Sequence, residues 1–273
     1  MIQTNKLYFN YRKQQNLFNN LTLKQKSGNI TGLLGKNGAG KSTLLNLLAG
    51  LLHPKQGSIE VNGYVPSKRD PNFLSDIFLV TDEPFLPSLT ISSYIRVYAP
   101  LYKNFDSEKM SRILKEFELF ENQKLDGISH GQKKKFVIAF ALSTNCKLLL
   151  LDEPTNGLDI PSKSVFRKVL VNSVDEEQLV IISTHQVKDI ETVIDKIVIL
   201  EEGKIVFEKD TYQITEKFQF QKTQSLSNIS EIIYSEKCPG GYKVILTAKD
   251  NEETVINIEL LFNAIINNVK LTF

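Results

Sequence analysis

The chain has 273 residues, of which 41% are apolar and 23% are charged, and its 33 Lys and Arg nearly balance 31 Asp and Glu to give a net charge of +2. This length allows one large domain or two smaller ones, with a substantial core. Two cysteines cannot form a disulfide framework, so two free thiols are favoured over a single disulfide. We find no run of about 20 apolar residues and no signal-peptide pattern, so we expect a cytoplasmic protein. The balanced charge does not favour a nucleic-acid partner.

The sequence of the first third of the chain predicts several short strands and one helix. The strands are expected at residues 7–11, 17–23, 29–34, 58–61 and 77–80. The helix is expected at residues 42–52, because leucines recur there at the spacing of one helix face. The apolar strand at 29–34 leads directly into a glycine-rich segment, so that strand, loop and helix follow one another.

The middle of the chain predicts helices without strands between them. They are expected at residues 91–101, 107–120 and 132–143, with Asp106 as the N-cap of the second. The helical section, about residues 82–130, is expected to be an inserted subdomain. The basic run at residues 133–135 is expected to be a solvated helix face.

Continuous apolar runs follow at residues 148–151 and 179–183, on either side of a helix near residues 162–171. Such runs are typical of strands that are buried on both faces of a parallel sheet. Strands that alternate with helices predict an α/β fold.

The C-terminal part differs in composition. A hairpin is expected over residues 196–207, because Gly203 can adopt a positive φ at its turn. Residues 1–208 are expected to form the main domain, and residues 209–273 a small C-terminal α+β accessory domain without a chemical motif. In that part we expect strands at 229–235 and 242–248 and a short helix at 258–267.

The segment GKNGAGKS at residues 35–42 matches the phosphate-binding pattern G-x-x-x-x-G-K-[ST]. Its glycines let backbone N–H groups surround phosphate oxygens, and the N-terminus of the following helix adds the positive end of its dipole. We expect Lys41 to reach the β- and γ-phosphates of a triphosphate, Ser42 to ligate Mg²⁺ and Thr43 to contact the α-phosphate. The residues predicted to bind the nucleotide here are Gly35, Lys36, Asn37, Gly38, Ala39, Gly40, Lys41, Ser42 and Thr43.

An acidic pair, Asp152 and Glu153, follows the four leucines at 148–151. We expect Asp152 to hold Mg²⁺ through its water shell and Glu153 to act as the general base that polarises the attacking water. A similar segment, Asp82-Glu83-Pro84, lies upstream, but the helical section follows it. We therefore assign the catalytic pair to the second copy.

Together these motifs resemble the nucleotide-binding domain of the ATP-binding cassette (ABC) family over about residues 1–208. The matching segments follow the family order: the phosphate loop, a signature-like ISHGQ at 128–132, the Walker B strand ending in Asp152 and Glu153, a D-loop at 157–159 and a switch histidine, His185. The resemblance implies a P-loop NTPase core with a parallel sheet, an N-terminal antiparallel β subdomain and the inserted helical subdomain.

The resemblance also implies a head-to-tail dimer, with ATP between the phosphate loop of one chain and the signature of the other. The signature residues that would then contact the nucleotide are Ser129, Gly131 and Gln132. His185 would sense the γ-phosphate during catalysis, and Asp159 would link the two sites. Tyr11 lies about where the family places an aromatic residue that stacks on adenine, although an ordinary strand aromatic is the alternative.

Two residues depart from the family pattern. His130 takes the place of a signature glycine. Asp82 stands where the family has the Q-loop glutamine, and a carboxylate there can ligate Mg²⁺ but adds negative charge near the γ-phosphate. Asp82 is therefore a candidate metal ligand beside Ser42 and Asp152. We expect Asp82→Gln to keep ATP binding and to change hydrolysis or its coupling.

The sequence thus predicts an ATP-hydrolysing subunit of a membrane transporter, peripheral at the inner face of the cell membrane. Its expected partners are an integral membrane permease subunit on a separate chain, docked by the helical section, and a second ABC ATPase, identical or different. The layout is similar to exporters of the ABC-2 class. The alternative is a soluble ABC ATPase that acts on ribosomes or DNA, which a single phosphate loop and balanced charge disfavour. A regulator without turnover would lack the base, whereas Glu153 is present.

Overall fold

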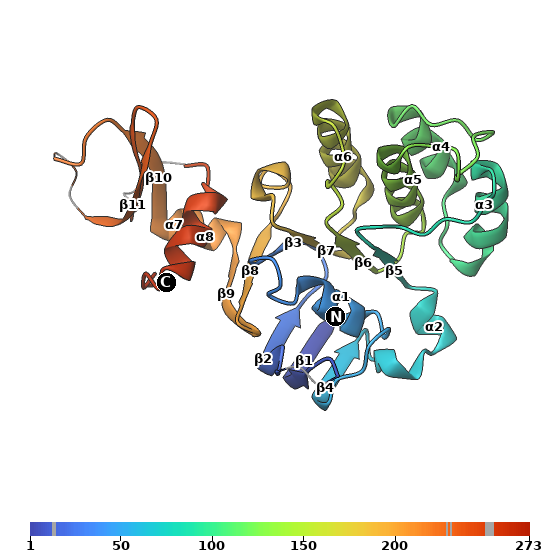
Figure 1. Cartoon of the computed structure of the whole chain (residues 1–273), viewed down its shortest axis with the longest axis horizontal. Coiled ribbons are helices and arrows are strands. Elements are labelled where there is room, and N and C mark those ends of the chain that lie inside the picture. Colours follow the sequence, from blue (N-terminus) through green and yellow to red (C-terminus); the bar gives the residue numbers. More distant parts are fainter. Residues whose placement is uncertain (13–14, 228, 230, 249–253) are drawn as a thin grey trace.

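The computed structural model describes residues 1–12, 15–227, 229, 231–248 and 254–273. The strands of its central sheet are β3 (Asn29–Leu34), β5 (Ile77–Val80), β6 (Leu148–Asp152), β7 (Leu179–Thr184), β8 (Lys196–Glu201) and β9 (Lys204–Asp210). They lie in the order β5-β6-β7-β3-β8-β9 (Figure 1). The first five in this order are parallel, and β9 pairs antiparallel with β8. The predicted α/β fold with a parallel sheet is confirmed.

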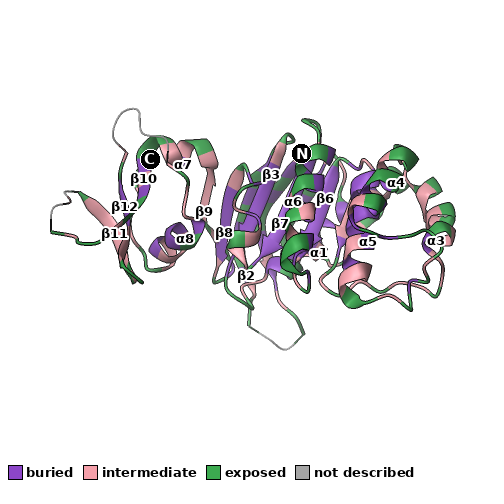
Figure 2. Ribbon diagram, turned by 90° about the horizontal axis from the view of Figure 1, so that it is seen from above, coloured by how far each residue is buried: buried purple, intermediate pink, exposed green. Residues whose placement is uncertain are grey.

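Side chains of the central strands enter two hydrophobic clusters, one on each face of the sheet. Along β6, Leu148 and Leu150 belong to one cluster, and Leu149 and Leu151 belong to the other. Both faces are therefore covered, and all residues of β6 and β7 are buried (Figure 2). This explains why these strands are continuously apolar rather than alternating.

An antiparallel sheet near the N-terminus covers one face of the central sheet. Its strands are β1 (Ile2–Phe9), β2 (Phe18–Gln25) and β4 (Gln56–Val61), in the order β2-β1-β4. Helix α1 (Lys41–Leu48) packs with both sheets in one cluster, and its leucines are fully buried. β1 starts five residues before the predicted strand and ends before Tyr11. The first part of β1 contains a buried polar residue, Thr4. Its hydroxyl oxygen accepts a hydrogen bond from the Leu23 N–H at 2.8 Å.

The helical section lies at one end of the molecule (Figure 1). Its helices are α3 (Ile91–Tyr98), η2 (Ala99–Leu101), α4 (Ser107–Glu116) and α5 (His130–Ser143), and the short η1 (Pro66–Lys68) and α2 (Pro71–Leu74) precede it. Asp106 caps α4 by accepting from the Lys109 N–H, as predicted. The predicted helix over 91–101 breaks into α3 and η2 because Pro100 lacks a donor N–H. α4 ends early because Glu118 adopts a left-handed φ of 57°, which terminates a helix.

Helix α6 (Ile160–Ser173) follows the D-loop and packs on the same face as α5. It starts two residues before the predicted helix, because Asp159 acts as its N-cap and accepts from the Ser162 N–H at 2.9 Å. The β8–β9 hairpin forms as predicted, with Gly203 at a φ of 73°.

The C-terminal elements lie at the opposite end from the helical section (Figure 1). They are α7 (Thr211–Lys217), β10 (Phe218–Thr223), β11 (Ile232–Cys238), β12 (Gly241–Thr247) and α8 (Ile258–Ile266), with a sheet in the order β10-β12-β11. The sequence did not indicate α7 and β10. The strand expected at 229–235 lies three residues later as β11, and residue 230 falls outside the described residues. Buried residues of this part, such as Phe218 and Leu261, belong to a cluster of the central sheet.

None of the helices in the described part of the chain has both the length and the apolar composition that a membrane span requires.

Candidate nucleotide-binding site

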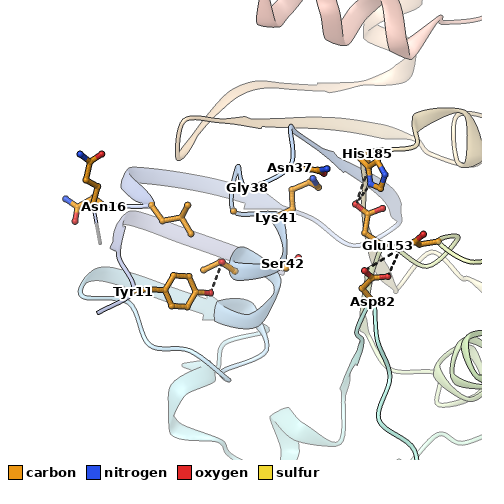
Figure 3. Close-up of a pocket in the computed structure, with 14 residues that line it drawn as sticks. Tyr11, Asn16, Asn37, Gly38, Lys41, Ser42, Asp82, Glu153 and His185 are labelled. Carbon is orange, nitrogen blue, oxygen red and sulfur yellow. Dashed lines mark hydrogen bonds and ion pairs between the residues drawn. The ribbon is translucent and has the colours of Figure 1, made fainter. Parts of the chain in front are cut away.

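A cavity of about 780 Å³ opens at the edge of the central sheet where its parallel strands end. Its lining comes from the segment after β1, the phosphate loop, and the loops after β5, β6 and β7. The lining residues are Tyr11, Gln15, Asn16, Leu17, Asn37, Gly38, Gly40, Lys41, Ser42, Thr43, Asp82, Glu153, Asn156 and His185. Tyr11 lies at one end of the cavity, and Asp82, Glu153 and His185 gather at the other (Figure 3).

The phosphate loop takes a shape that depends on two glycines. Gly38 and Gly40 have φ values of 82° and 107°, which side chains disfavour. A Cβ on Gly40 would lie 2.6 Å from the Phe18 ring, whereas the space over Gly38 is open. The loop therefore packs on β2 from one side and presents its backbone to the cavity from the other, as a phosphate cradle requires.

Lys41 begins α1 and is nearly buried. Its ammonium group donates to the Gly35 carbonyl oxygen at 2.8 Å and to that of Lys36 at 3.4 Å. Burial lowers the pKa of Lys41, and the charges of Glu153 and Asp152 oppose that shift. The lysine charge is thus held above the loop, where a triphosphate would meet it.

The other predicted loop residues divide into two groups. Asn37, Ser42 and Thr43 line the cavity, whereas the Lys36 ammonium group forms an ion pair with Glu201 at 2.8 Å. Gly35 and Ala39 belong to the loop without lining the described cavity wall. Gly35 contributes its carbonyl oxygen to Lys41.

Tyr11 is partly exposed and faces the cavity. Its hydroxyl shares a hydrogen bond with the Thr43 hydroxyl at 2.9 Å (Figure 3). The Phe9 ring packs edge-on against the Tyr11 ring with a centroid separation of 5.0 Å. These contacts fix the ring beside the start of α1. Its stacking on adenine stays a prediction.

The acidic pair after β6 is held by β7 and the residue that follows it. The Ser183 hydroxyl donates to the buried carboxylate of Asp152. Glu153 Oε1 accepts from the His185 backbone N–H at 3.1 Å and lies 2.8 Å from His185 Nδ1. Glu153 also adopts a φ of 46°, which residues other than glycine rarely do. The predicted base and the predicted switch histidine are therefore direct partners.

The signature residues lie elsewhere. Ser129 caps α5 by accepting from the Gln132 N–H at 3.2 Å, and Gln132 Oε1 accepts from the Ser129 N–H at 3.0 Å. Among the described lining residues of the cavity, none comes from residues 128–132 and none is Asp159. His130 packs against Gly157, where a Cβ would lie 3.1 Å from the histidine ring, so the D-loop makes room for the bulkier residue.

Asp82 has partners that the sequence did not indicate. Its carboxylate accepts from Lys134 Nζ at 2.9 Å and from Asn156 Nδ2 at 3.1 Å. The expectation that the basic run at 133–135 is a solvated face is wrong for Lys134, whose side chain is fully buried. The sequence signal was a carboxylate at a strand end near the phosphate loop, where a cation is expected, but nothing in the sequence identifies Lys134 as that cation.

The oxygen donors near the phosphate loop fit a magnesium ion. Among the described residues, no group of three His, Cys, Asp or Glu forms a metal cage. Ser42 and Asp152 are hard oxygen donors, and Mg²⁺ takes most of its other ligands from water and phosphate. Since two donors already engage Asp82, its role as a metal ligand stays a prediction.

Helix α8 lies against the same region from the C-terminal side. It lines a second cavity of about 330 Å³ with residues 35–37 of the phosphate loop, Thr184 and His185. Glu259 at its start pairs with Lys188 of η3 (Val187–Asp189) at 3.4 Å and with Lys243 of β12 at 3.5 Å. The C-terminal segment therefore contacts the element that follows His185.

The parallel sheet, the phosphate loop after β3 and the acidic pair at the end of β6, with β7 between these two strands, define a P-loop nucleoside triphosphatase. The family described as ABC transporter matches residues 18–156.

Curated relatives support this family. The chain is 35% identical over 208 residues to the SkfA peptide export ATP-binding protein SkfE of Bacillus subtilis. This match covers 74% of this chain and 86% of the relative. It is 34% identical over 212 residues to the bacitracin transport ATP-binding protein BcrA of Bacillus licheniformis. This match covers 76% of this chain and 69% of the relative. The solved structure of an ATP-binding subunit of an ABC transporter matches with a TM-score of 0.70 and 26% identity. The match covers 78% of this chain and 91% of the solved chain. The chain belongs to the ABC transporter family, as an ATP-hydrolysing, ATP-binding subunit.

Proposed function

We propose that this subunit drives substrate export through a separate integral membrane permease by ATP-dependent dimerisation. The supporting observation is that, among the described residues, the cavity contains the phosphate loop and the acidic residue but not the signature residues. It holds the phosphate loop, Glu153 and His185, while Ser129 and Gly131 lie outside it at the start of α5. A second copy, or another ABC ATPase, that presents its own signature completes the site. The peptide-export and bacitracin-transport names of two relatives favour export.

Within each site the residues take distinct roles. Lys41 and the loop backbone bind the phosphates, and Ser42 and Asp152 hold Mg²⁺, which neutralises phosphate charge when bound. Glu153 accepts a proton from the attacking water, and His185 orients Glu153 through Nδ1. Tyr11 packs on the adenine, and Asp159 lies at the contact between the two chains. ATP favours the closed dimer, and loss of the γ-phosphate removes the contact that holds it closed.

The permease docks on an apolar groove beside the helical section, which places the subunit at the inner face of the membrane. The groove has a volume of about 510 Å³ and is lined by Ala49, Leu51, Arg69, Pro71, Leu74, Ser75, Ile77, Leu79, Leu101 and Tyr102. Two of these lining residues, Leu51 and Leu101, are 54% and 60% exposed. Large apolar side chains exposed together mark a surface for protein contact.

Glu153→Gln tests the composite site. The amide cannot accept the proton from water, so the variant should bind Mg·ATP without hydrolysing it and accumulate as a dimer by light scattering. Ser129→Arg added to Glu153→Gln blocks the signature and should return the protein to monomer. A Glu153→Gln protein that stays monomeric at saturating Mg·ATP, alone and with co-expressed permease, would contradict ATP-dependent self-association. Co-sedimentation with ribosomes or DNA in place of a membrane protein would contradict the transport role.

A further inference from the structure

Lys134 is a lysine whose side chain is completely buried, in the second turn of α5. Its ammonium group donates to the carbonyl oxygen of Asp82, to Asp82 Oδ1 at 2.9 Å and to the carbonyl oxygen of Glu153 at 3.0 Å. An ammonium group has three N–H donors, so these bonds use all of them. Lys134 therefore joins the loops after β5 and β6 to the helix that begins at the signature.

The carboxylate of Asp82 is equally engaged. It also accepts from Asn156 Nδ2 at 3.1 Å, and the Asn156 backbone N–H donates to the Glu153 carbonyl oxygen at 3.2 Å. Burial acts to raise the pKa of Asp82, but the bonds from Lys134 and Asn156 and the lysine charge outweigh it and lower the pKa below its ordinary value. Lys134 and Asp82 therefore form an ion pair, with Nζ and Oδ1 2.9 Å apart.

We propose that the Lys134–Asp82 pair positions Glu153 and links it to the signature helix. The proposal rests on the role of Glu153 as general base given above. Glu153 adopts a φ of 46°, and the Lys134 bond to its carbonyl oxygen stabilises this costly backbone conformation. Because the backbone sets the direction of the Glu153 side chain, the pair acts on hydrolysis through Glu153. Lys134 is a positioning residue.

The same pair makes Glu153 responsive to the second nucleotide of the dimer. Ser129 and Lys134 lie on one continuous segment, the N-cap and second turn of α5. When the start of α5 engages the ATP of the other chain, the helix moves as a unit and Lys134 moves with it. Hydrolysis at one site therefore depends on signature engagement at the other.

A double-mutant cycle tests the pair directly. Asp82→Asn leaves a buried ammonium group without its counter-charge, and Lys134→Gln leaves a carboxylate uncompensated beside the phosphates and frees the Glu153 carbonyl oxygen. Each single variant should lower kcat by about tenfold or more, while the affinity for a fluorescent ATP analogue stays within about twofold. In the double variant both members are neutral. Its kcat should be at least about fivefold higher than that of the single variant with the lower kcat.

The control cycle uses the exposed ion pair between Lys168 of α6 and Glu116 of α4, which also has an Nζ–Oε distance of 2.9 Å. Because exposed pairs contribute little, Lys168→Gln, Glu116→Gln and their combination should all stay within about twofold in kcat. Melting temperatures of all variants show whether a loss of kcat is a loss of folded protein.

The outcomes separate this proposal from the proposed function. If the losses of the two single variants multiply in the double variant, the proposal is overturned, even when Glu153→Gln abolishes hydrolysis. If Glu153→Gln hydrolyses ATP normally, the base assignment itself is wrong. Should Lys134→Gln not fold, Asn156→Ala removes one bond to Asp82 and keeps the ion pair. It should lower kcat by about two- to fivefold at unchanged nucleotide affinity, and a wild-type kcat would overturn the proposal.

Discussion

Two adjacent strands of this protein, β5 and β6, lead into the same three residues, Asp-Glu-Pro, at 82–84 and at 152–154. In sequence, Asp82 aligns with Asp152. In the sheet, Val80 pairs with Leu151, and this register carried forward places Asp82 level with Glu153 instead. The two copies are thus offset by one residue at the site, and this offset gives the matching residues different neighbours.

The neighbours determine what each copy can do. At the end of β6, the hydroxyls of Ser183 and Thr184 and the His185 backbone N–H donate to Asp152 and Glu153 and hold these carboxylates in place. After β5, which lies at the edge of the sheet, there is no further strand, and α5 supplies Lys134 to Asp82. Glu83 is exposed. The same three residues therefore place Glu153 against His185 in the sheet interior and Asp82 against Lys134 at the sheet edge.

The largest expected effect separates the two glutamates. Glu153→Gln should lower kcat for ATP hydrolysis by about 10²-fold or more, since it removes the proposed general base. Glu83→Gln is the matched control, in the same sequence context, and should stay within about twofold. The measurement is steady-state phosphate release at saturating Mg·ATP. Equal losses from the two substitutions would mean that the copies are not functionally distinct.

A smaller effect is expected at His185, which distinguishes the β6 copy by its contact with Glu153 Oε1. His185→Ala removes a hydrogen bond to a charged group, so kcat should fall by about 10- to 100-fold. His53→Ala removes an exposed histidine after α1 and should leave kcat unchanged. A wild-type rate in His185→Ala would show that Glu153 does not need its contact with the His185 side chain.

Much of this arrangement was predictable because it depends on local sequence. Apolar runs identified β6 and β7, leucine spacing identified α1, and the glycine pattern identified the phosphate loop. Helix ends were less predictable, because a single residue such as Pro100 or Glu118 stops a pattern that otherwise continues. In the C-terminal part, β10 was missed because only Phe218 and Phe220 alternate inward in a short strand.

Lys134 shows why the rest of the site could not be predicted. Its neighbours Lys133 and Lys135 are partly exposed, and three consecutive lysines indicate a solvated surface. Its burial depends on Asp82, which is 52 residues away in the chain and comes close only when α5 packs beside β5. A pairing over that separation is a property of the fold rather than of either segment.

The smallest expected effect lies at the opposite ends of the same two strands. Cys146, just before β6, donates through Sγ to the Ser75 carbonyl oxygen near the start of β5 at 3.7 Å. Burial raises the pKa of the Cys146 thiol to about 12, against the ordinary value of 9.0, so almost no thiolate forms near pH 8. Partly exposed Cys238 should react readily with a thiol reagent, whereas Cys146 should react only after unfolding.

Thiol counting with and without denaturant measures this difference, and Cys238→Ser assigns the fast thiol. The starts of β5 and β6 should stay closed when Mg·ATP binds, because the changes proposed for α5 act at the strand ends that face the cavity. Cys146 should therefore be equally protected in free and ATP-bound protein. If Mg·ATP makes Cys146 reactive in the Glu153→Gln variant, β5 and β6 separate along their whole length when nucleotide binds. The different roles of the two acidic loops would then depend on whether nucleotide is bound.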